Sequence, residues 1–347
     1  MTQATAAPEV GAALESGSPA LGRGPWNQGL RRLRRNRPAM VALAVFLGVV
    51  AVSLLAPFYA GHVAHTDPFN SNLAGTTVVH SKRVDVLQQS AGLGLGESPI
   101  GPTWDVHHFF LGADSEGRDV AARVLYGGRA SLLISIGAAV ASSVIATGLA
   151  LAAGFFGGLI DSVISRLMDM LWAFPVFLLA ILIATVSLTQ GLQLGPLAVN
   201  PGSLLLPIVI IALIFVPYAY RPIRGQVLAV RERDFVKAAI VEGASNRWLI
   251  LREILPNVVT TVLVLLPLLI ALDILVESGL SFLGIGVQPP QASWGTIIGN
   301  GTGLLYTRPW VAIAPGLMIL LVVLSLNVLG DGIRDALDPR AKLRIEA

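Results

Sequence analysis

Two acidic residues, Asp273 and Glu277, interrupt an otherwise uncharged apolar segment that runs from Ile254 to Leu280. Because they are four positions apart, their side chains would share one face of a helix. A carboxylate that faces lipid costs roughly 2.5–3.5 kcal/mol, so acids inside apolar spans usually face a bundle interior or an aqueous cavity. Two interpretations stay open. Either the pair lines a path through the protein, or it lies near the outer surface, where acids at a helix end are capped or paired locally.

The other side chains give no sign of catalysis or of a bound cofactor. The chain has no cysteine, which excludes disulfides and thiolate sites. It has no His-Glu-x-x-His motif, and the serines in its apolar segments have no obvious histidine partner, so we expect no intramembrane enzyme. None of the three lysines follows a glycine, as a phosphate-binding loop requires, so we expect no ATP on this chain. The spacing of the five histidines matches no zinc pattern, so we predict no metal site; they are His62, His65, His80, His107 and His108.

The composition is that of a membrane protein. Hydrophobic residues make up 54% of the 347 positions and charged residues only 13%, whereas soluble domains carry about 25% charged residues. The mean hydropathy is +0.71. The net charge of +3 could suggest nucleic acid as a partner, but the distribution of charge matters more than its total, and we predict no nucleic-acid binding.

Six segments are apolar enough for bilayer crossings, each of which needs about 20 residues in a helix. One uncharged run of fifty-one residues, from Met170 to Tyr220, is broken by the turn cluster "TQGLQLGPLAVNPGS" and predicts two helices. The other four predicted spans are Pro38–Ala60, Ser131–Ile160, Ile254–Leu280 and Pro309–Gly330. The sequence therefore predicts an all-α membrane protein with six transmembrane helices.

The distribution of lysine and arginine predicts the orientation of these spans. With both termini in the cytoplasm, 18 of the 24 basic residues lie on the cytoplasmic side. The six that do not are Lys82, Arg83, Arg118, Arg123, Arg129 and Arg308. The reverse orientation would invert this bias, so we expect cytoplasmic termini and a long external loop between the first two spans.

This topology places "ERDFVKAAIVEGASNRWLILREILPN" in the cytoplasmic loop between the fourth and fifth spans. Asp234 can cap a first short helix, and Gly243 suits the left-handed position that ends it. Ser245 can cap a second helix through Leu255, and Pro256 then marks the return to the membrane. A helix–glycine–helix with an apolar stripe is suited to lie in a groove of another protein. The alternative is a basic loop that only fixes the topology.

The loop resembles a known motif. The order Ala238-Ala239, Gly243 and Ile254-Leu255-Pro256 is similar to the "EAA…G…I-LP" loop of ABC importer permeases, with Lys237 where that family usually has Glu. Three other segments resemble the dipeptide/oligopeptide group of that family, in particular the second (C-type) member of the permease pair. They are "LGADSEGRDVAARVLYGGRASL", "ESGLSFLGIGVQPPQASWG" and "LGDGIRDALDPR". The resemblance covers about Leu30 to Arg340, apart from a longer stretch near Thr76 to Phe110.

This resemblance implies a type I ABC importer permease fold in the bacterial cytoplasmic (inner) membrane. It implies a heterodimer with a second homologous permease, two cytoplasmic ATPases that bind ATP and Mg, and an external substrate-binding protein. Peptides are the cargo we expect, and the acids of the fifth span could meet a peptide amino group. A nickel chelate, glutathione or an oligosaccharide is the alternative cargo. An ion-coupled secondary transporter is a further alternative, but it predicts internal repeats, and we find none. The residues implied to contact the ATPases are Lys237, Ala238, Ala239, Glu242, Gly243, Ala244, Ser245, Ile254, Leu255 and Pro256.

The predicted organisation has five parts. Residues 1–30 form a disordered tail, 31–60 the cytoplasmic entry and first span, 61–130 the external loop, 131–330 the core with a cytoplasmic loop at 221–256, and 331–347 the C-terminal tail. The external loop is predicted to contain a mixed-charge helix, which either docks the binding protein or, as we favour, pairs its own charges and lies on the membrane. Its charged residues are Asp114, Glu116, Arg118, Asp119 and Arg123.

Overall fold

The computed structural model describes residues 25–79, 82–89, 96–194 and 197–337. Most of them are helical, and η1 and η2 are π-helical whereas η3 is a single 3-10 turn. In chain order the elements are α1 (Pro25–Arg35), α2 (Arg37–Leu54), α3 (Ala56–Phe58), η1 (Tyr59–Val63), β1 (Thr76–Val79), β2 (Lys82–Asp85), β3 (Leu87–Gln89), β4 (Glu97–Pro99), α4 (Val120–Phe156), α5 (Gly158–Trp172), α6 (Val176–Gln190), β5 (Leu192–Leu194), β6 (Leu197–Val199), α7 (Leu205–Arg231), α8 (Asp234–Val241), α9 (Asn246–Trp248), η2 (Leu249–Ile254), α10 (Leu255–Phe282), α11 (Trp294–Gly301), η3 (Thr302–Leu304) and α12 (Trp310–Leu337).

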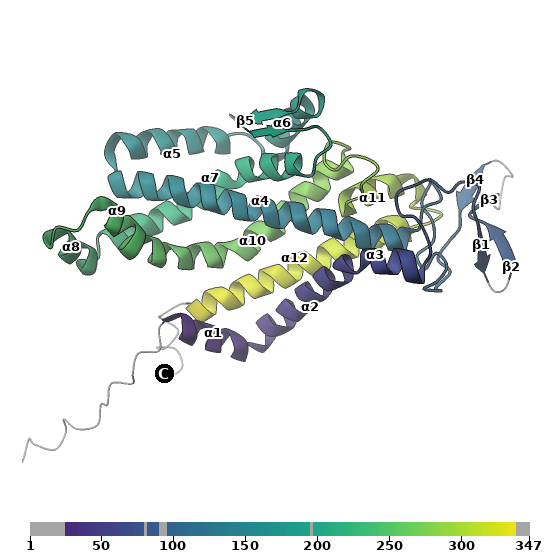
Figure 1. Cartoon of the computed structure of the whole chain (residues 1–347), viewed down its shortest axis with the longest axis horizontal. Coiled ribbons are helices and arrows are strands. Elements are labelled where there is room, and N and C mark those ends of the chain that lie inside the picture. Colours follow the sequence, from purple (N-terminus) through teal and green to yellow (C-terminus); the bar gives the residue numbers. More distant parts are fainter. Residues whose placement is uncertain (1–24, 80–81, 90–95, 195–196, 338–347) are drawn as a thin grey trace, which may run out of the picture.

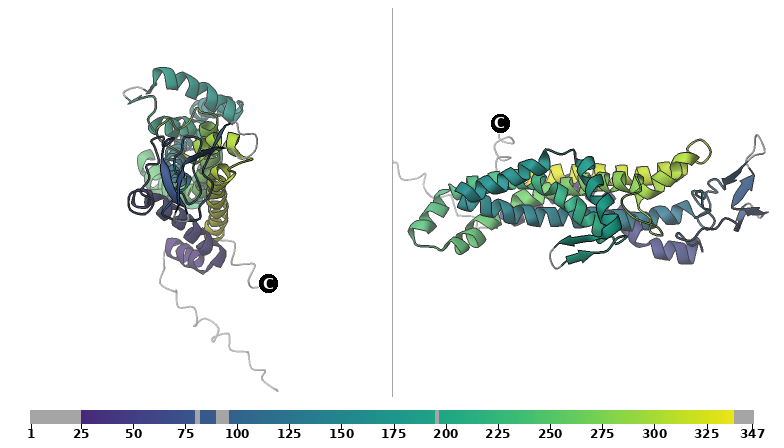
Figure 2. Two further views of the ribbon diagram at one scale, coloured as in Figure 1. Left: turned by 90° about the vertical axis from the view of Figure 1, so that its right-hand side faces the viewer. Right: turned by 90° about the horizontal axis from the view of Figure 1, so that it is seen from above.

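The long helices lie side by side along the longest axis of the molecule (Figure 1). The antiparallel pairs β1–β2 and β3–β4 lie at one end, and α8 and α9 lie at the opposite end. Figure 2 shows that α1 and α2 occupy one edge of the bundle and that α5 and α6 occupy the other. The external loop and the loop between α7 and α10 are therefore separated by the full length of the bundle.

The described chain contains five helices long and apolar enough to cross a membrane, and six spans if the bent pair α5–α6 counts as one. This confirms the predicted all-α, six-span fold. The turn cluster between the third and fourth predicted spans forms the short hairpin β5–β6. The cytoplasmic location of the termini stays a prediction.

The core forms where α4 and α7 pack along their lengths. The face of α4 toward the core carries small residues, among them Ala138, Ala146, Ala150 and Ala153, all fully buried. Small side chains let helix backbones approach closely inside a membrane. Larger buried side chains of α7, such as Ile211 and Ile223, fill the space opposite.

Two predicted boundaries are wrong. The third span does not run straight from Met170, because the chain breaks at residues 173–175 and α6 is bent by 89° from α5. Pro175 precedes α6, and its ring prevents the helix from continuing through it. The tail predicted at 1–30 is too long, because α1 already begins at Pro25. Residues 1–24 and 338–347 of the predicted tails lie outside the described residues.

The mixed-charge helix predicted in the external loop is also wrong. From Asp114 to Asp119 the chain makes a tight turn closed by hydrogen bonds from the Asp114 N–H to the Arg118 carbonyl and from the Gly117 N–H to the Asp114 carbonyl, both at 3.0 Å, and α4 starts only at Val120. Four of the five charged side chains are buried, and only Glu116 is exposed, so the charges do not cover an exposed helix surface. A turn brings Asp114 and Arg118 close enough to pair and leaves Gly117 with a positive φ of 72°.

Candidate functional site: the α8–α9 loop and its supports

The backbone of the loop between α7 and α10 is fixed by a helix stop and a helix cap. Gly243 has φ +84°, the left-handed conformation that glycine adopts without strain. Its N–H donates to the Ile240 carbonyl, and the Ala244 N–H donates to the Ala239 carbonyl, both at 3.0 Å. These two bonds make a Schellman motif, which satisfies carbonyls at the end of α8. Gly243 therefore ends α8 as predicted.

The next helix starts at the predicted cap. The Ser245 hydroxyl accepts a hydrogen bond from the Trp248 N–H at 3.3 Å. Two details of the prediction are wrong. Asp234 is the first residue of α8 and makes no cap, and the second helix does not stop before Pro256. Instead α9, η2 and α10 form one continuous helical segment from Asn246 to Phe282, and Pro256, the second residue of α10, lies within it directly after the π-helical η2.

The loop has a buried face and an exposed apolar face. Val236, Leu249 and Ile254 are buried and hold α8 against η2. The outward face presents large apolar side chains to solvent, and Val241 is 89% exposed. The others in this group are Phe235, Ile240, Trp248 and Leu251. A cluster of exposed apolar side chains on a rigid loop is typical of a protein–protein contact.

Lys237 lies on this loop and forms an ion pair with Glu232, with 3.2 Å between Nζ and Oε2. Both side chains are more than half exposed. The acid that pairs with Lys237 therefore comes from the residues just before α8. Of the other predicted loop residues, Ala238 to Ser245 lie at the tip, and Ile254 to Pro256 lie where η2 passes into α10.

Asp273 and Glu277 of α10 are both buried inside the bundle. The Glu277 carboxylate accepts hydrogen bonds from Ser281 at 2.7 Å and Ser278 at 3.3 Å. Neither carboxylate oxygen of Asp273 has a hydrogen-bond partner within the described chain. Glu277 is thus paired locally, Asp273 is not, and a role for either residue in a transport path stays a prediction.

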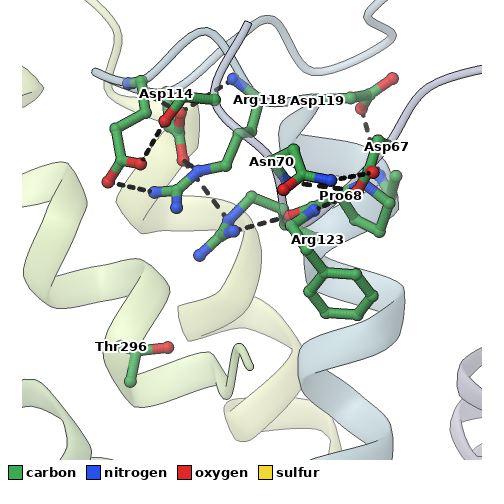
Figure 3. Close-up of polar contacts among 12 residues, drawn as sticks. Asp67, Pro68, Asn70, Asp114, Arg118, Asp119, Arg123 and Thr296 are labelled. Carbon is green, nitrogen blue, oxygen red and sulfur yellow. Dashed lines mark hydrogen bonds and ion pairs between the residues drawn. The ribbon is translucent and has the colours of Figure 1, made fainter. Parts of the chain in front are cut away.

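The turn before α4 holds a buried cluster of charges (Figure 3). Arg118 Nε lies 2.8 Å from Asp114 Oδ2, and Arg123 Nε lies 3.4 Å from the same oxygen. Arg123 Nη1 donates to the Pro68 carbonyl at 2.7 Å. The cluster therefore fastens the segment after η1 to the first turn of α4. Among the described residues no three His, Asp or Glu side chains are arranged to hold a metal ion; His80 lies outside them.

Comparison with protein families identifies the family of this chain. Residues 144–343 match the family described as binding-protein-dependent transport system inner membrane component. The match includes the whole of the α8–α9 loop and α10. The chain belongs to this permease family. Residues 24–75 of the permease also match the N-terminal TM domain of oligopeptide transport permease C, so the stretch from Thr76 to Phe110 lies between the two matched regions.

The permease is similar to curated relatives over nearly its whole length. It is 33% identical to the dipeptide transport system permease protein DppC of Alkalihalophilus pseudofirmus, over 92% of this chain and 91% of the relative. It is 33% identical to the oligopeptide transport system permease protein OppC of Haemophilus influenzae, over 92% and 90%. It is 32% identical to the glutathione transport system permease protein GsiD of Pectobacterium atrosepticum, over 92% and 93%.

The structure of the permease also shows a set of polar contacts that sequence reasoning missed, between antiparallel helices α5 and α7. Asp161 receives two hydrogen bonds from Arg224, each at 2.5 Å. One helical turn further, Ser165 Oγ lies 3.0 Å from the Tyr220 hydroxyl. We call these contacts, together with the 2.9 Å bond from Arg221 to Asp169, the polar ladder. The four-residue spacing of Asp161, Ser165 and Asp169 in the sequence was the signal that could have found it.

Proposed function

We propose that this permease is a transmembrane subunit of an ATP-driven importer that carries peptides. It would pair with a second homologous permease in the bacterial cytoplasmic membrane and receive cargo from an external substrate-binding protein. Its family and its length-matched relatives support this proposal, because those relatives are named for dipeptide, oligopeptide and glutathione transport. Glutathione is itself a modified tripeptide, so the three cargoes share peptide chemistry.

The observation that carries the proposal is the exposed apolar face of the α8–α9 loop. The loop is the part of the described chain farthest from β1–β4 (Figure 1). It is rigid, because the Schellman motif at Gly243 and the cap at Ser245 fix its backbone. Exposed side chains such as Val241 and Trp248 would be buried in a groove of an ATPase subunit. ATP and Mg would be bound by that subunit, since this chain carries no phosphate-binding loop.

The continuity of α9, η2 and α10 gives the loop a mechanical role. A displacement of α8 or α9 would be transmitted to α7 at one end of the loop and to α10 at the other, because both connections are short. On the α10 side this displacement is transmitted through η2, which is π-helical. Interruptions of this kind are frequent at functional sites in helices. Movement of these helices would switch the permease between outward-facing and inward-facing states.

The experiment is purification of the complete complex followed by uptake in proteoliposomes. We expect two ATPase subunits to co-purify and uptake of labelled peptides to require ATP. Competition by unlabelled dipeptides and longer peptides, against a nickel chelate and an oligosaccharide, assigns the cargo. Uptake by the chain purified without ATPases, in vesicles that contain no ATP, would contradict the proposal.

Glycine variants test the loop within the same assay. Gly243→Val forces a branched side chain into the left-handed region, which costs roughly 1–2 kcal/mol or more for a residue other than glycine. We expect it to release the ATPases and abolish ATP-driven uptake while the spans stay folded. Gly225→Ala in α7 is the matched control, because a Cβ there meets no atom within 4 Å and its φ is not positive. Equal uptake in both variants would show that the loop has no role in the transport mechanism.

A further inference from the structure

The half of α7 that leads to α8 is held from two sides. On one side the polar ladder joins it to α5, through Arg224 and its two bonds to Asp161. A bidentate pair between arginine and carboxylate fixes the relative orientation of its two partners as well as their distance. The contacts of the ladder recur along α5 at Asp161, Ser165 and Asp169, so a slip of one helix along the other would break all of them together.

On the other side, α7 packs tightly against the end of α4. A Cβ added to Gly154 would lie 2.7 Å from Val227 Cγ1, so the two helices are as close as a glycine allows. The Arg231 guanidinium donates to the Gly154 carbonyl at 3.4 Å and lies 6.0 Å from the Phe155 ring. The ends of α4 and α7, together with α5, are therefore held together by polar contacts and close packing. We call these three segments the block.

Helix α10 is arranged differently. Near the loop it is separated from α7 and α12 by a groove of about 620 Å³, whose lining includes Gln226 of α7 and Thr261 of α10. Toward its other end α10 packs against α11 so closely that a Cβ added to Gly295 would overlap the Ser278 carbonyl, and α11 is hydrogen-bonded to α4 through the Trp294 N–H and the Ser131 hydroxyl. Helix α10 is thus held by contacts at the end far from the α8–α9 loop and is separated from α7 by the groove at the end near the loop. Relative movement of α7 and α10 breaks the fewest contacts at the end near the loop.

We propose that Asp161, Ser165 and Asp169 are positioning residues that make α4, α5 and α7 move as one body when the α8–α9 loop is displaced. The movement is taken up between α7 and α10, across the groove. Because α5 continues into α6 through the 89° bend, the block also carries the start of α6, whose Phe177 packs on Gly279 of α10. This inference rests on the proposed function, since it concerns how the ATPases drive the permease.

The first experiment breaks and restores the ladder in the reconstituted complex. Asp161→Asn and Arg224→Gln remove the bidentate ion pair, and the double variant Asp161→Arg/Arg224→Asp restores it with reversed charges. We expect the single variants to keep ATP hydrolysis but to lose peptide uptake per ATP by about tenfold, a size typical of coupling between two sites. The double variant should recover most of it. Arg166→Gln is the matched control, because Arg166 is exposed on the same helix and forms no ion pair with the described residues.

The second experiment does not depend on the folding of those variants. The chain has no cysteine, so introduced pairs are its only thiols. A bismaleimide bridge between Trp172→Cys of α5 and Tyr218→Cys of α7, whose rings lie 5.8 Å apart, stays within the block, and we expect uptake to be unchanged by it. A bismaleimide bridge between Gln226→Cys and Thr261→Cys spans the groove, and we expect it to stop uptake. The other subunits are used in cysteine-free form.

The possible outcomes separate the two proposals. Loss of uptake on bridging the Trp172/Tyr218 pair, in a double variant that transports before bridging, would overturn the single-body inference. Unchanged uptake per ATP in Asp161→Asn and Arg224→Gln would overturn it as well. A wild-type complex that shows no ATP-driven peptide uptake would instead contradict the proposed function, whatever the ladder variants do.

Discussion

Trp294 donates its indole N–H to the carbonyl oxygen of Val124 at 2.9 Å, across 170 residues of sequence. The backbone N–H of the same tryptophan donates to the Ser131 hydroxyl at 3.1 Å. Trp294 is fully buried, and it joins the start of α11 to the N-terminal half of α4. The two helices are therefore fixed to each other at the end of the bundle opposite the α8–α9 loop.

We predict that Trp294→Ala destabilises the permease by about 3–5 kcal/mol, the usual loss for a buried aromatic side chain. Trp294→Phe keeps most of the packing and should lose only about 1 kcal/mol, because it removes one hydrogen bond. Thermal unfolding in detergent measures both. Tyr306→Ala is the control, since Tyr306 is fully exposed and should change little. Equal effects of the Ala and Phe variants would show that the hydrogen bond, not the packing, dominates.

The buried charge cluster of Asp114, Arg118 and Arg123 gives a second prediction, for Asp114. Its carboxylate is buried and pairs with two buried arginines, Arg118 and Arg123. Asp114→Ala leaves both guanidinium groups without this carboxylate, and removal of one partner from a buried ion pair costs about 3–5 kcal/mol. We expect a lower unfolding temperature and faster proteolysis of the segment around Pro68, which Arg123 fastens. Glu116→Gln is the matched control, because that side chain is 47% exposed. A loss in the control as large as that in Asp114→Ala would contradict a local role for the buried pair.

The same cluster shows what the sequence could and could not predict. Alternating charges at Asp114, Arg118 and Arg123 have a spacing close to helical, and their pattern alone favours an exposed helix. The turn at Gly117 and the distant partner Pro68 decide otherwise, and neither is visible in a local pattern. Gly243 and Ser245, by contrast, were predictable because helix stops and caps depend on residues a few positions apart.

The polar ladder was missed for a related reason. Asp161 and Asp169 made the segment 158–172 appear too charged for a span, so the prediction began the third span only at Met170. The partners that make those charges tolerable, Arg224 and Arg221, lie more than 50 residues away. Composition along one helix cannot show that its charges are paired with those of another.

A third prediction concerns Glu277. Glu277→Ala removes the acceptor for the two buried hydroxyls of Ser278 and Ser281, and each one left unpaired costs about 1–3 kcal/mol. Glu277→Gln keeps a carbonyl oxygen for them and should stay closer to the wild type. Leu275→Ala on the same helix is the control, because Leu275 is 45% exposed and faces away from the core. A Gln variant as unstable as the Ala variant would show that the charge itself, and not the acceptor, is needed.

The final prediction is a pH dependence that originates at Asp119, the residue that caps α4. Its carboxylate accepts hydrogen bonds from the Ala122 N–H at 3.1 Å and from the Thr66 hydroxyl at 3.3 Å. Burial, with a smaller contribution from the nearby Asp114, nevertheless raises its pKa from the ordinary value of 3.8 to about 6. Below pH 4 the group is protonated in the folded and the unfolded states and contributes nothing. Between pH 4 and pH 6 only the folded state keeps the proton, so stability falls as the pH rises, and above pH 6 the loss is complete.

A pKa difference of about two units between the folded and unfolded states lowers the free energy of unfolding at neutral pH by roughly 3 kcal/mol. Asp119→Asn should recover part of this, because asparagine caps a helix as well as aspartate does and carries no charge to bury. We expect its unfolding temperature at pH 7.5 to match or exceed that of the wild type, and the decrease between pH 4 and pH 6 to become smaller. Asp67→Asn reports the opposite sign, since the Phe69 N–H lowers the pKa of Asp67, and an acid with a lowered pKa stabilises the fold as the pH rises. A wild-type protein whose unfolding temperature rises from pH 4 to pH 6 by the same amount as that of Asp119→Asn would contradict the assignment to Asp119.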